Sequence, residues 1–153
     1  MKDYSFTRTA SMFKQILVVC TGNICRSPIA EGLLKKALPE KQISSAGTAA
    51  VLRAPADPHS RAVCAEHDVD VSAHVARQLT LAMLQESDLV LVLDATHAAW
   101  LNSRYPQFRG KVHKLGKWQK DVDVPDPYMQ PREAFEDCYQ TIEAMVQEWL
   151  KRV

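Results

Sequence analysis

The sequence predicts a three-layer α/β/α fold in which helices cover both faces of a central four-stranded parallel sheet. Short runs that are apolar throughout, such as Ile16–Cys20 and Leu89–Leu93, are typical of strands buried on both faces. They alternate with segments that have helical apolar spacing, which is the pattern of a parallel sheet. The chain has 153 residues without internal repeats or linkers. We therefore expect one domain over residues 12–153, preceded by a flexible extension at 1–11.

The first half of the chain contains two of the expected strands, 16–20 and 42–46. Between them, apolar residues recur at helical spacing from Ile29 onward. Pro28 suits the first turn of that helix, and Pro39 ends it. After the second strand, a loop rich in proline and alanine leads to Asp57-Pro58, a typical helix start, and a helix is expected over 59–67.

The second half continues the alternation. A short helix is expected over 80–86, with Thr80 as its cap, followed by the strand 89–93. A further helix over 96–105 and a fourth strand over 111–115 come next. The segment 121–131 is rich in proline and aspartate and is predicted to be a loop. The last expected helix covers 132–151, with a long apolar stripe.

Composition excludes several classes of function. The net charge is +1, from 19 basic and 18 acidic residues, which indicates no nucleic-acid or anionic-membrane partner. The N-terminus lacks the apolar run of a signal peptide, and no apolar stretch is long enough to span a bilayer, so a cytoplasmic protein is expected. The four cysteines and five histidines lack metal-ligand spacing, so no metal site is predicted.

Cys20 and Arg26 bracket a short loop between the first strand and the first helix. Successive backbone N–H groups from Thr21 to Arg26 can curl around one anion, and the helix that starts near Ser27 adds its partial positive charge. Arg26 can bind two phosphate oxygens through its planar guanidinium. We expect Gly22 to allow the tight turn by taking a positive φ. The positive charge of Arg26 and of the helix start also favours the thiolate form of a nearby cysteine, which makes Cys20 the candidate nucleophile.

A lone cysteine at the end of a buried strand is more simply interpreted as a small core residue. Here, however, the pattern Cys-x5-Arg-Ser-Pro lies between a strand and a helix, which favours a phosphate-binding loop. The nucleotide-binding pattern G-x-x-x-x-G-K-[ST] is absent. The loop from Cys20 to Ser27 is therefore predicted to bind phosphate and to carry the nucleophile.

A phenolic leaving group needs a proton donor, because the pKa of tyrosine is about 10. Asp126, in the sequence Val-Pro-Asp-Pro-Tyr, is the candidate acid, since the flanking prolines would hold its carboxyl in one orientation. Taken alone, this segment is more typical of an ordinary turn aspartate. Asp121 and Asp123 lie nearby and are weaker rivals.

Several segments together resemble the low-molecular-weight protein tyrosine phosphatase family. They are V-V-C-T-G-N-I-C-R-S-P-I-A-E-G at 18–32, P-D-P-Y at 125–128, Ser-Ser-Ala-Gly at 44–47, Ala-Asp-Pro at 56–58 and Ser-x-His-x-Ala-Arg-Gln-Leu at 72–79. The resemblance runs from about Ile16 to the C-terminus. It implies a flavodoxin-like fold with strand order 2-1-3-4, hydrolysis of phosphotyrosine without a cofactor, and a monomer or weak dimer.

The resemblance also implies a role for each site residue. Cys20 would form a phosphocysteine, Arg26 would stabilise the transferred phosphoryl group, and Asp126 would act first as acid and then as base on water. The loop residues implied to bind the phosphate are Thr21, Gly22, Asn23, Ile24 and Cys25.

Support for the loop is implied in the same way. Ser27 would hydrogen-bond the Cys20 thiolate. Asn23 would hold the shape of the loop through a network with Ser45 and His74. His74 would then be a structural histidine rather than a catalytic one.

The walls of the cleft suggest the substrate. Tyr128 would form one wall, and the opposite wall, aromatic in animal enzymes of the family, corresponds here to the aliphatic Val51. An aliphatic wall resembles that of the bacterial branch of the family, which is associated with the tyrosine kinases of capsule and exopolysaccharide production. The expected partner is therefore a bacterial tyrosine autokinase of this kind. Family members that act on phosphoarginine carry threonine at the position of Ile24, so the apolar side chain favours a phenyl ring.

The other cysteines bear on regulation and on alternative functions. In many relatives a pair like Cys20 and Cys25 forms a protective reversible disulfide, whereas a passive second cysteine is the simpler interpretation. Arsenate reductase of the same fold would need two further cysteines in a flexible segment, but Cys64 and Cys138 lie on predicted helices. A phosphotyrosine-binding module without turnover would lack Cys20 or Asp126, and both are present.

Overall fold

The structure is a computed structural model that describes residues 13–153; the extension predicted at 1–11 lies outside the described residues. A parallel sheet of four strands crosses the molecule in the order β2-β1-β3-β4, which confirms the predicted order. The strands are β1 (Gln15–Cys20), β2 (Gln42–Gly47), β3 (Leu89–Val92) and β4 (Val112–Lys114).

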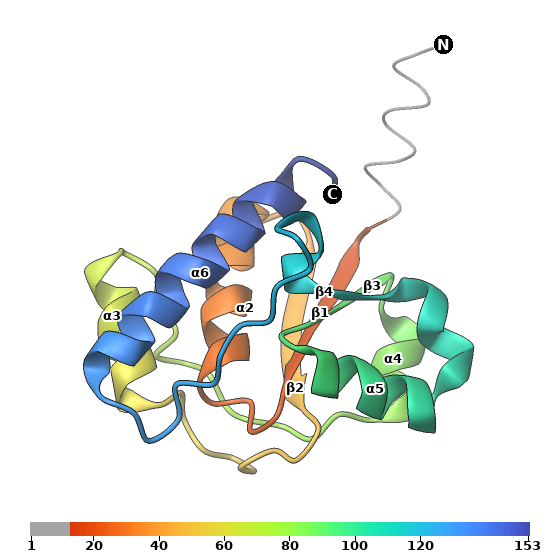
Figure 1. The fold of residues 1–153 in the computed structure, drawn as a ribbon, viewed down its shortest axis with the longest axis horizontal. Coiled ribbons are helices and arrows are strands. Elements are labelled where there is room, and N and C mark those ends of the chain that lie inside the picture. The colour runs from red at the N-terminus through yellow and green to blue at the C-terminus, as the bar shows by residue number, and fades with distance from the viewer. Residues whose placement is uncertain (1–12) are drawn as a thin grey trace.

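Helices cover both faces of this sheet, as the alternating pattern predicts. In Figure 1, α2, α3 and α6 lie on one side of the strands, and α4 and α5 lie on the other. The helices are α2 (Arg26–Ala37), α3 (Pro58–Glu66), α4 (Leu81–Glu86), α5 (Ala95–Arg104) and α6 (Arg132–Leu150). The three-layer α/β/α prediction is therefore confirmed.

The central strand β1 contributes side chains to two separate hydrophobic clusters, because successive side chains of a strand point to opposite faces of the sheet. Ile16 and Val18 belong to the cluster that includes buried residues of α2 and α6. Leu17 and Val19 belong to the cluster that contains Leu84 of α4 and Leu101 of α5. Every residue of β1 from Ile16 to Cys20 is buried, which explains why this strand reads as an uninterrupted apolar run.

The predicted ends of the elements differ from the observed ones by one or two residues. Lys111 and Leu115, predicted as strand, belong instead to short 3₁₀ helices, η1 (Pro106–Lys111) and η2 (Leu115–Trp118). The reason is that β4 is an edge strand paired only along part of β3, from Val90 to Val92. Within the described residues, no helix is long and apolar enough to cross a membrane.

The parallel direction of the strands places the chemistry at one edge of the sheet. Cys20 and Gly47 are register partners at the carboxyl ends of β1 and β2, and β3 ends beside them at Val92. Loops that leave the carboxyl ends of parallel strands meet there, and such an edge is where ligands bind in α/β folds. The loop from Thr21 to Cys25 starts at this edge and leads into α2.

Candidate active site

A cavity of about 180 Å³ opens beside the loop that joins β1 to α2. It brings together residues from that loop, from the segment after β2 and from the segment before α6. The lining residues are Cys20, Thr21, Gly22, Ile24, Cys25, Arg26, Ala49, Val51, Asp126 and Tyr128. The candidate nucleophile, phosphate-binding arginine and acid thus share one cavity, although Arg26 and Asp126 are far apart in sequence.

The carbonyl groups of the loop are hydrogen-bonded to the rest of the described chain, whereas its N–H groups are not. Every carbonyl oxygen from Cys20 to Cys25 accepts a hydrogen bond from the surrounding scaffold, the donors being Thr48 N, Ala49 N, Val51 N, the His74 ring, Asp57 N and Ser60 Oγ. Among residues 13–153, the N–H groups from Thr21 to Cys25 find no acceptor. Outward carbonyls and unpaired amides at a helix start make an anion-binding site.

The tight turn in this loop is made by Asn23 and not by Gly22. Asn23 has a φ of 60°, whereas none of the described glycines has a positive φ. The prediction that Gly22 supplies the left-handed residue was therefore wrong. Asparagine tolerates this region better than most side chains. Here its amide is also held on both sides: Arg77 N donates to Asn23 Oδ1 at 2.9 Å, and Asn23 Nδ2 donates to Ser45 Oγ at 2.9 Å.

The Cys20 sulfur receives a hydrogen bond from Ser27. Cys20 Sγ and Ser27 Oγ are 2.9 Å apart, and both side chains are buried. Asn23 Nδ2 donates to Ser27 Oγ at 2.8 Å, so the serine's own proton is left for the sulfur. A hydroxyl donor aimed at sulfur stabilises the thiolate over the thiol.

Behind the loop, the network extends further than the sequence predicted. His74 Nε2 lies 2.6 Å from the Asn23 carbonyl oxygen, and Ser45, as expected, contacts the Asn23 amide. The Ser45 hydroxyl in turn donates to Glu31, a residue of α2 to which the sequence assigned no role. Glu31 also pairs with Lys35 at 2.7 Å. Hydrogen bonds through Ser27, Asn23 and Ser45 therefore connect the sulfur to this carboxylate.

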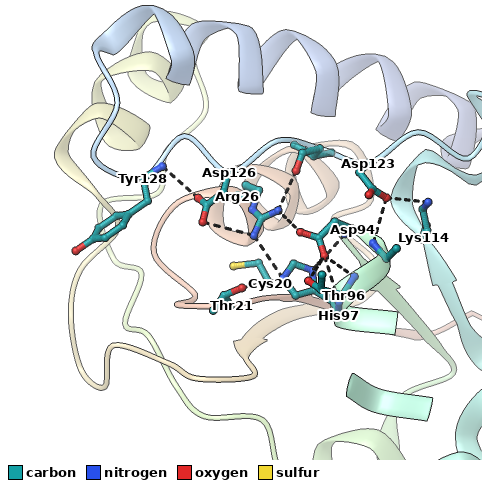
Figure 2. A network of polar contacts seen from close by, with 12 residues as sticks. Cys20, Thr21, Arg26, Asp94, Thr96, His97, Lys114, Asp123, Asp126 and Tyr128 are labelled. Carbon is teal, nitrogen blue, oxygen red and sulfur yellow. Dashed lines mark hydrogen bonds and ion pairs between the residues drawn. The ribbon is translucent and has the colours of Figure 1, made fainter. Parts of the chain in front are cut away.

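Arg26 is buried and held by two acceptors from distant segments. Its Nη1 donates to Asp94 Oδ2 at 2.7 Å and to the Val124 carbonyl oxygen at 2.8 Å. Figure 2 shows these bonds converging on the guanidinium beside Cys20. Burial by itself favours a neutral Arg26, but the bond to Asp94 and the negative charges of Cys20 and Asp126 outweigh it and raise the pKa of Arg26. Arg26 is thus a fixed cation.

Asp94 and His97 are the site residues that sequence reasoning missed. Burial would raise the pKa of Asp94, yet hydrogen bonds from Thr96 and Arg26 lower it to about 2. Burial lowers the pKa of His97 to about 4. Asp94 also caps α5, accepting from the N–H groups of Thr96 and His97. A signal was present, because an aspartate directly after the strongest predicted strand lies at the sheet edge where the Cys20 loop starts.

Asp126 lines the cavity from the segment before α6. One of its oxygens accepts from Tyr128 N at 3.1 Å, and the other is 3.8 Å from Arg26 Nη2. Its rivals point elsewhere. Lys114 pairs with Asp123 at 2.8 Å and with Asp121 at 3.4 Å, and neither rival lines the cavity. Figure 2 shows the Asp123–Lys114 pair to one side of Arg26, and Asp123 also accepts from Ala95 N at 3.1 Å.

The rims of the cavity are apolar. Val51 and Tyr128 line it, with exposed fractions of 47% and 51%, so each offers a large open face. Ile24 also lines the cavity and is partly buried. Val51 is tied to the loop through its N–H, which donates to the Gly22 carbonyl oxygen at 3.0 Å. Together these three side chains make an apolar slot in the lining of the cavity.

All four cysteines are free and buried. Cys25 lines the same cavity as Cys20, and its burial raises the pKa of its thiol. Cys64 on α3 and Cys138 on α6 are core residues, with pKa values raised by burial to about 12. Inert thiols inside helices do not supply the flexible cysteine pair of an arsenate reductase.

Comparison with known proteins agrees with this geometry. A family model described as low molecular weight phosphotyrosine protein phosphatase matches residues 15–153. The low molecular weight protein-tyrosine-phosphatase Etp of Escherichia coli K12 is 43% identical over 141 residues, which cover 92% of this chain and 95% of Etp.

Solved structures give the same result. Vibrio vulnificus Wzb in complex with benzylphosphonate superposes with a TM-score of 0.89 at 43% identity, over 92% of this chain and 99% of that one. The YwlE arginine phosphatase of Geobacillus stearothermophilus has a TM-score of 0.85 at 30% identity, over 90% and 91% of the two chains. The family model spans nearly all described residues and the relatives cover almost their whole length, so this chain belongs to the low molecular weight phosphotyrosine protein phosphatase family.

Proposed function

We propose that this chain is a protein-tyrosine phosphatase in which Cys20 is the nucleophile, Arg26 the phosphoryl-binding cation and Asp126 the general acid. The observation that carries the proposal is the loop beside Cys20 whose carbonyl groups are all hydrogen-bonded to the scaffold, while its amides from Thr21 to Cys25 have no acceptor among the described residues. A trigonal phosphoryl group in transit carries its charge on three oxygens, and such a ring of donors stabilises it.

In the first step, the Cys20 thiolate attacks phosphorus and the bond from phosphorus to the tyrosyl oxygen breaks. Asp126, protonated at this stage, transfers its proton to the departing oxygen, and a phosphocysteine remains. Arg26 and the amides of the loop bind the equatorial oxygens. The Ser27 hydroxyl, 2.9 Å from the sulfur, stabilises the thiolate before attack and after release.

In the second step, water attacks the phosphocysteine. Asp126, now a carboxylate, removes a proton from this water, the bond between sulfur and phosphorus breaks, and inorganic phosphate leaves. Asp126 is half exposed at the mouth of the cavity, which gives it access both to a bound phenolic oxygen and to solvent water. Its 3.8 Å distance from Arg26 keeps it beside the reacting phosphoryl group.

The apolar slot in the cavity supports an aromatic substrate. Ile24, Val51 and Tyr128 can contact the two faces of a phenyl ring, and benzylphosphonate, the ligand of the Vibrio Wzb structure, has such a ring. We propose that the physiological substrate is the phosphotyrosine tail of a bacterial autokinase linked to exopolysaccharide production, met in the cytoplasm. The aliphatic wall at Val51 supports this branch of the family.

Phosphotyrosine, phosphoserine and phosphoarginine peptides of matched sequence, assayed side by side, test the proposal. We expect turnover of the phosphotyrosine peptide and little of the others, because only the aryl ring fills the slot. Equal rates on all three would contradict the assignment. Faster release of phosphate from the phosphoarginine peptide than from the phosphotyrosine peptide would instead indicate the arginine phosphatase activity for which YwlE is named.

The Cys20→Ser variant tests the nucleophile in the same assay. Its turnover should fall roughly 10⁴-fold or more, the size of effect seen when a covalent nucleophile is removed. It should still bind inorganic phosphate or vanadate, because the amides and Arg26 remain. Unchanged turnover by this variant would exclude Cys20 as the nucleophile.

A further inference from the structure

His97 lies beneath the phosphate-binding loop, on the first turn of α5, and only 2% of it is exposed. Both of its ring nitrogens have polar neighbours. Nδ1 is 3.2 Å from the backbone nitrogen of Asp94, and Nε2 is 2.9 Å from Thr21 Oγ1. Asp94, Arg26, Asp123 and Asp126 are the charged groups that act on the ring.

The shorter contacts of the ring favour one tautomer of His97, because Arg26 Nη2 and Asp94 Oδ1, which would favour the other tautomer, both lie farther away, at 3.4 Å. A backbone N–H can only donate, so Nδ1 accepts from Asp94 and the proton of the neutral ring lies on Nε2. The Nε2–H group therefore donates to Thr21 Oγ1. Burial and the neighbouring Arg26 lower the pKa of His97, despite the opposing charge of Asp94, so the ring is neutral at pH 7.

This tautomer leaves the Thr21 hydroxyl as a donor for the cavity. Thr21 follows Cys20 directly and lines the cavity. Because its oxygen accepts from His97, its own hydroxyl proton is not used there, and residues 13–153 offer it no other hydrogen-bond partner. Arg26 Nη2 lies 3.4 Å from His97 Nε2 and could only donate to it, so this longer contact is not a hydrogen bond in the tautomer that the shorter contacts to Asp94 N and Thr21 favour.

We propose that His97 is a positioning residue of the phosphate-binding loop, holding the Thr21 hydroxyl so that its proton points to the anion bound in the cavity. The inference rests on the proposed phosphatase function and adds a side-chain donor to the ring of backbone amides. Arg26, through Asp94, and Thr21, through His97, are then both oriented by the N-terminal turn of α5.

Two substitutions separate this role from helix capping. Asn at position 97 keeps an acceptor where Nδ1 caps α5 but has no donor that reaches Thr21. Gln at position 97 places an amide N–H close to where Nε2 lies but loses the capping acceptor. At the loop, Thr21→Val removes the hydroxyl at nearly constant shape, and Thr21→Ser keeps it.

The measurement is kcat/KM with p-nitrophenyl phosphate, together with the inhibition constant of inorganic phosphate and the melting temperature of each variant. We expect His97→Asn to lower kcat/KM by about tenfold and to weaken inhibition by phosphate, the loss expected for one hydrogen bond to an anion. His97→Gln should recover most of this loss. Thr21→Val should lower kcat/KM by the same factor as His97→Asn. The double variant should have a kcat/KM no lower than that of Thr21→Val alone.

Equal losses in the Asn and Gln variants, or a double variant that loses the product of the two single factors, would overturn the proposal. If the variants at position 97 fail to fold, the two Thr21 variants still test the proposal. Equal kcat/KM values for Thr21→Val and Thr21→Ser would show that the Thr21 hydroxyl is not a donor to the bound anion. A wild-type chain that does not hydrolyse p-nitrophenyl phosphate would instead refute the proposed function itself.

Discussion

Arg26 and Asp126 show how differently two residues of one site are held. Arg26 is buried, and two short hydrogen bonds fix its guanidinium from segments beyond the loop. Asp126 is half exposed, and its one close hydrogen bond comes from the N–H of Tyr128, two residues along. A change at Arg26 would remove the cation that pairs with the partly buried Asp94 and disturb the fold, whereas a change at Asp126 should alter the chemistry alone.

We therefore expect Asp126→Asn to fold normally and to lose the ability to protonate a poor leaving group. The amide oxygen still accepts from Tyr128 N, but the proton donor is gone, so kcat for phenyl phosphate should fall roughly 10²- to 10⁴-fold. The loss with p-nitrophenyl phosphate should be smaller, because its leaving group is more acidic. Steady-state kinetics with both esters would measure this difference.

Asp123→Asn is the matched control, since Asp123 lies on the same segment but pairs with Lys114 outside the cavity. It should leave both rates near those of the unchanged chain. If Asp126→Asn slowed both esters by the same factor, Asp126 would not be the leaving-group acid.

At the scale of elements, the carboxyl end of β2 sets the position of the loop that follows β1. Gly47 is the register partner of Cys20, and a Cβ atom there would lie 2.3 Å from the Thr21 carbonyl oxygen. The glycine is needed for space and not for a special backbone angle, because its φ is negative. The strand end and the loop are thus packed backbone against backbone.

Gly47→Ala should accordingly damage both stability and activity. A backbone oxygen cannot move aside as a flexible side chain can, so we expect a loss of about 2–3 kcal/mol in the free energy of unfolding and a fall in kcat/KM. Urea unfolding and steady-state kinetics would measure the two effects. Gly110→Ala is the control, since its Cβ meets nothing within 4 Å and should change stability by less than about 0.5 kcal/mol. Equal effects of both substitutions would contradict this packing argument.

At the scale of the whole molecule, the sheet gathers buried charged and titratable groups from distant segments at one edge. His97 and Asp94 both have pKa values below their ordinary ones, about 4 and about 2. Between pH 6.5 and 4 the unfolded chain binds a proton at His97 that the folded chain does not, and below pH 3.8 the same holds for Asp94. Folding stability is therefore complete above pH 6.5 and is lost as the pH falls.

The His97 contribution should amount to a loss on the order of 2–3 kcal/mol between pH 6.5 and 4. Urea unfolding at several pH values would measure it. In the His97→Gln variant the curve of stability against pH should be flatter over this range than in the unchanged chain. An unaltered slope in the His97→Gln variant would show that another group is responsible.

Local patterns determined much of this protein. The strand β1, the start of α2 after the Cys20 loop and the Asp57 cap of α3 follow from short-range causes, namely side-chain periodicity, proline position and capping chemistry. The spacing of Cys20 and Arg26 was equally readable, because a candidate nucleophile and a cation in one loop need no distant partner to be recognised.

Only the tertiary structure decided what holds those residues. Arg26 finds Asp94 and Val124 at separations of 68 and 98 residues, and Thr21 finds His97 at 76. The left-handed turn also moved from Gly22 to Asn23, because the Asn23 amide is fixed by Arg77 and Ser45 from other segments. Such contacts depend on which strand ends meet at the edge of the sheet, and a local pattern carries no information about that meeting.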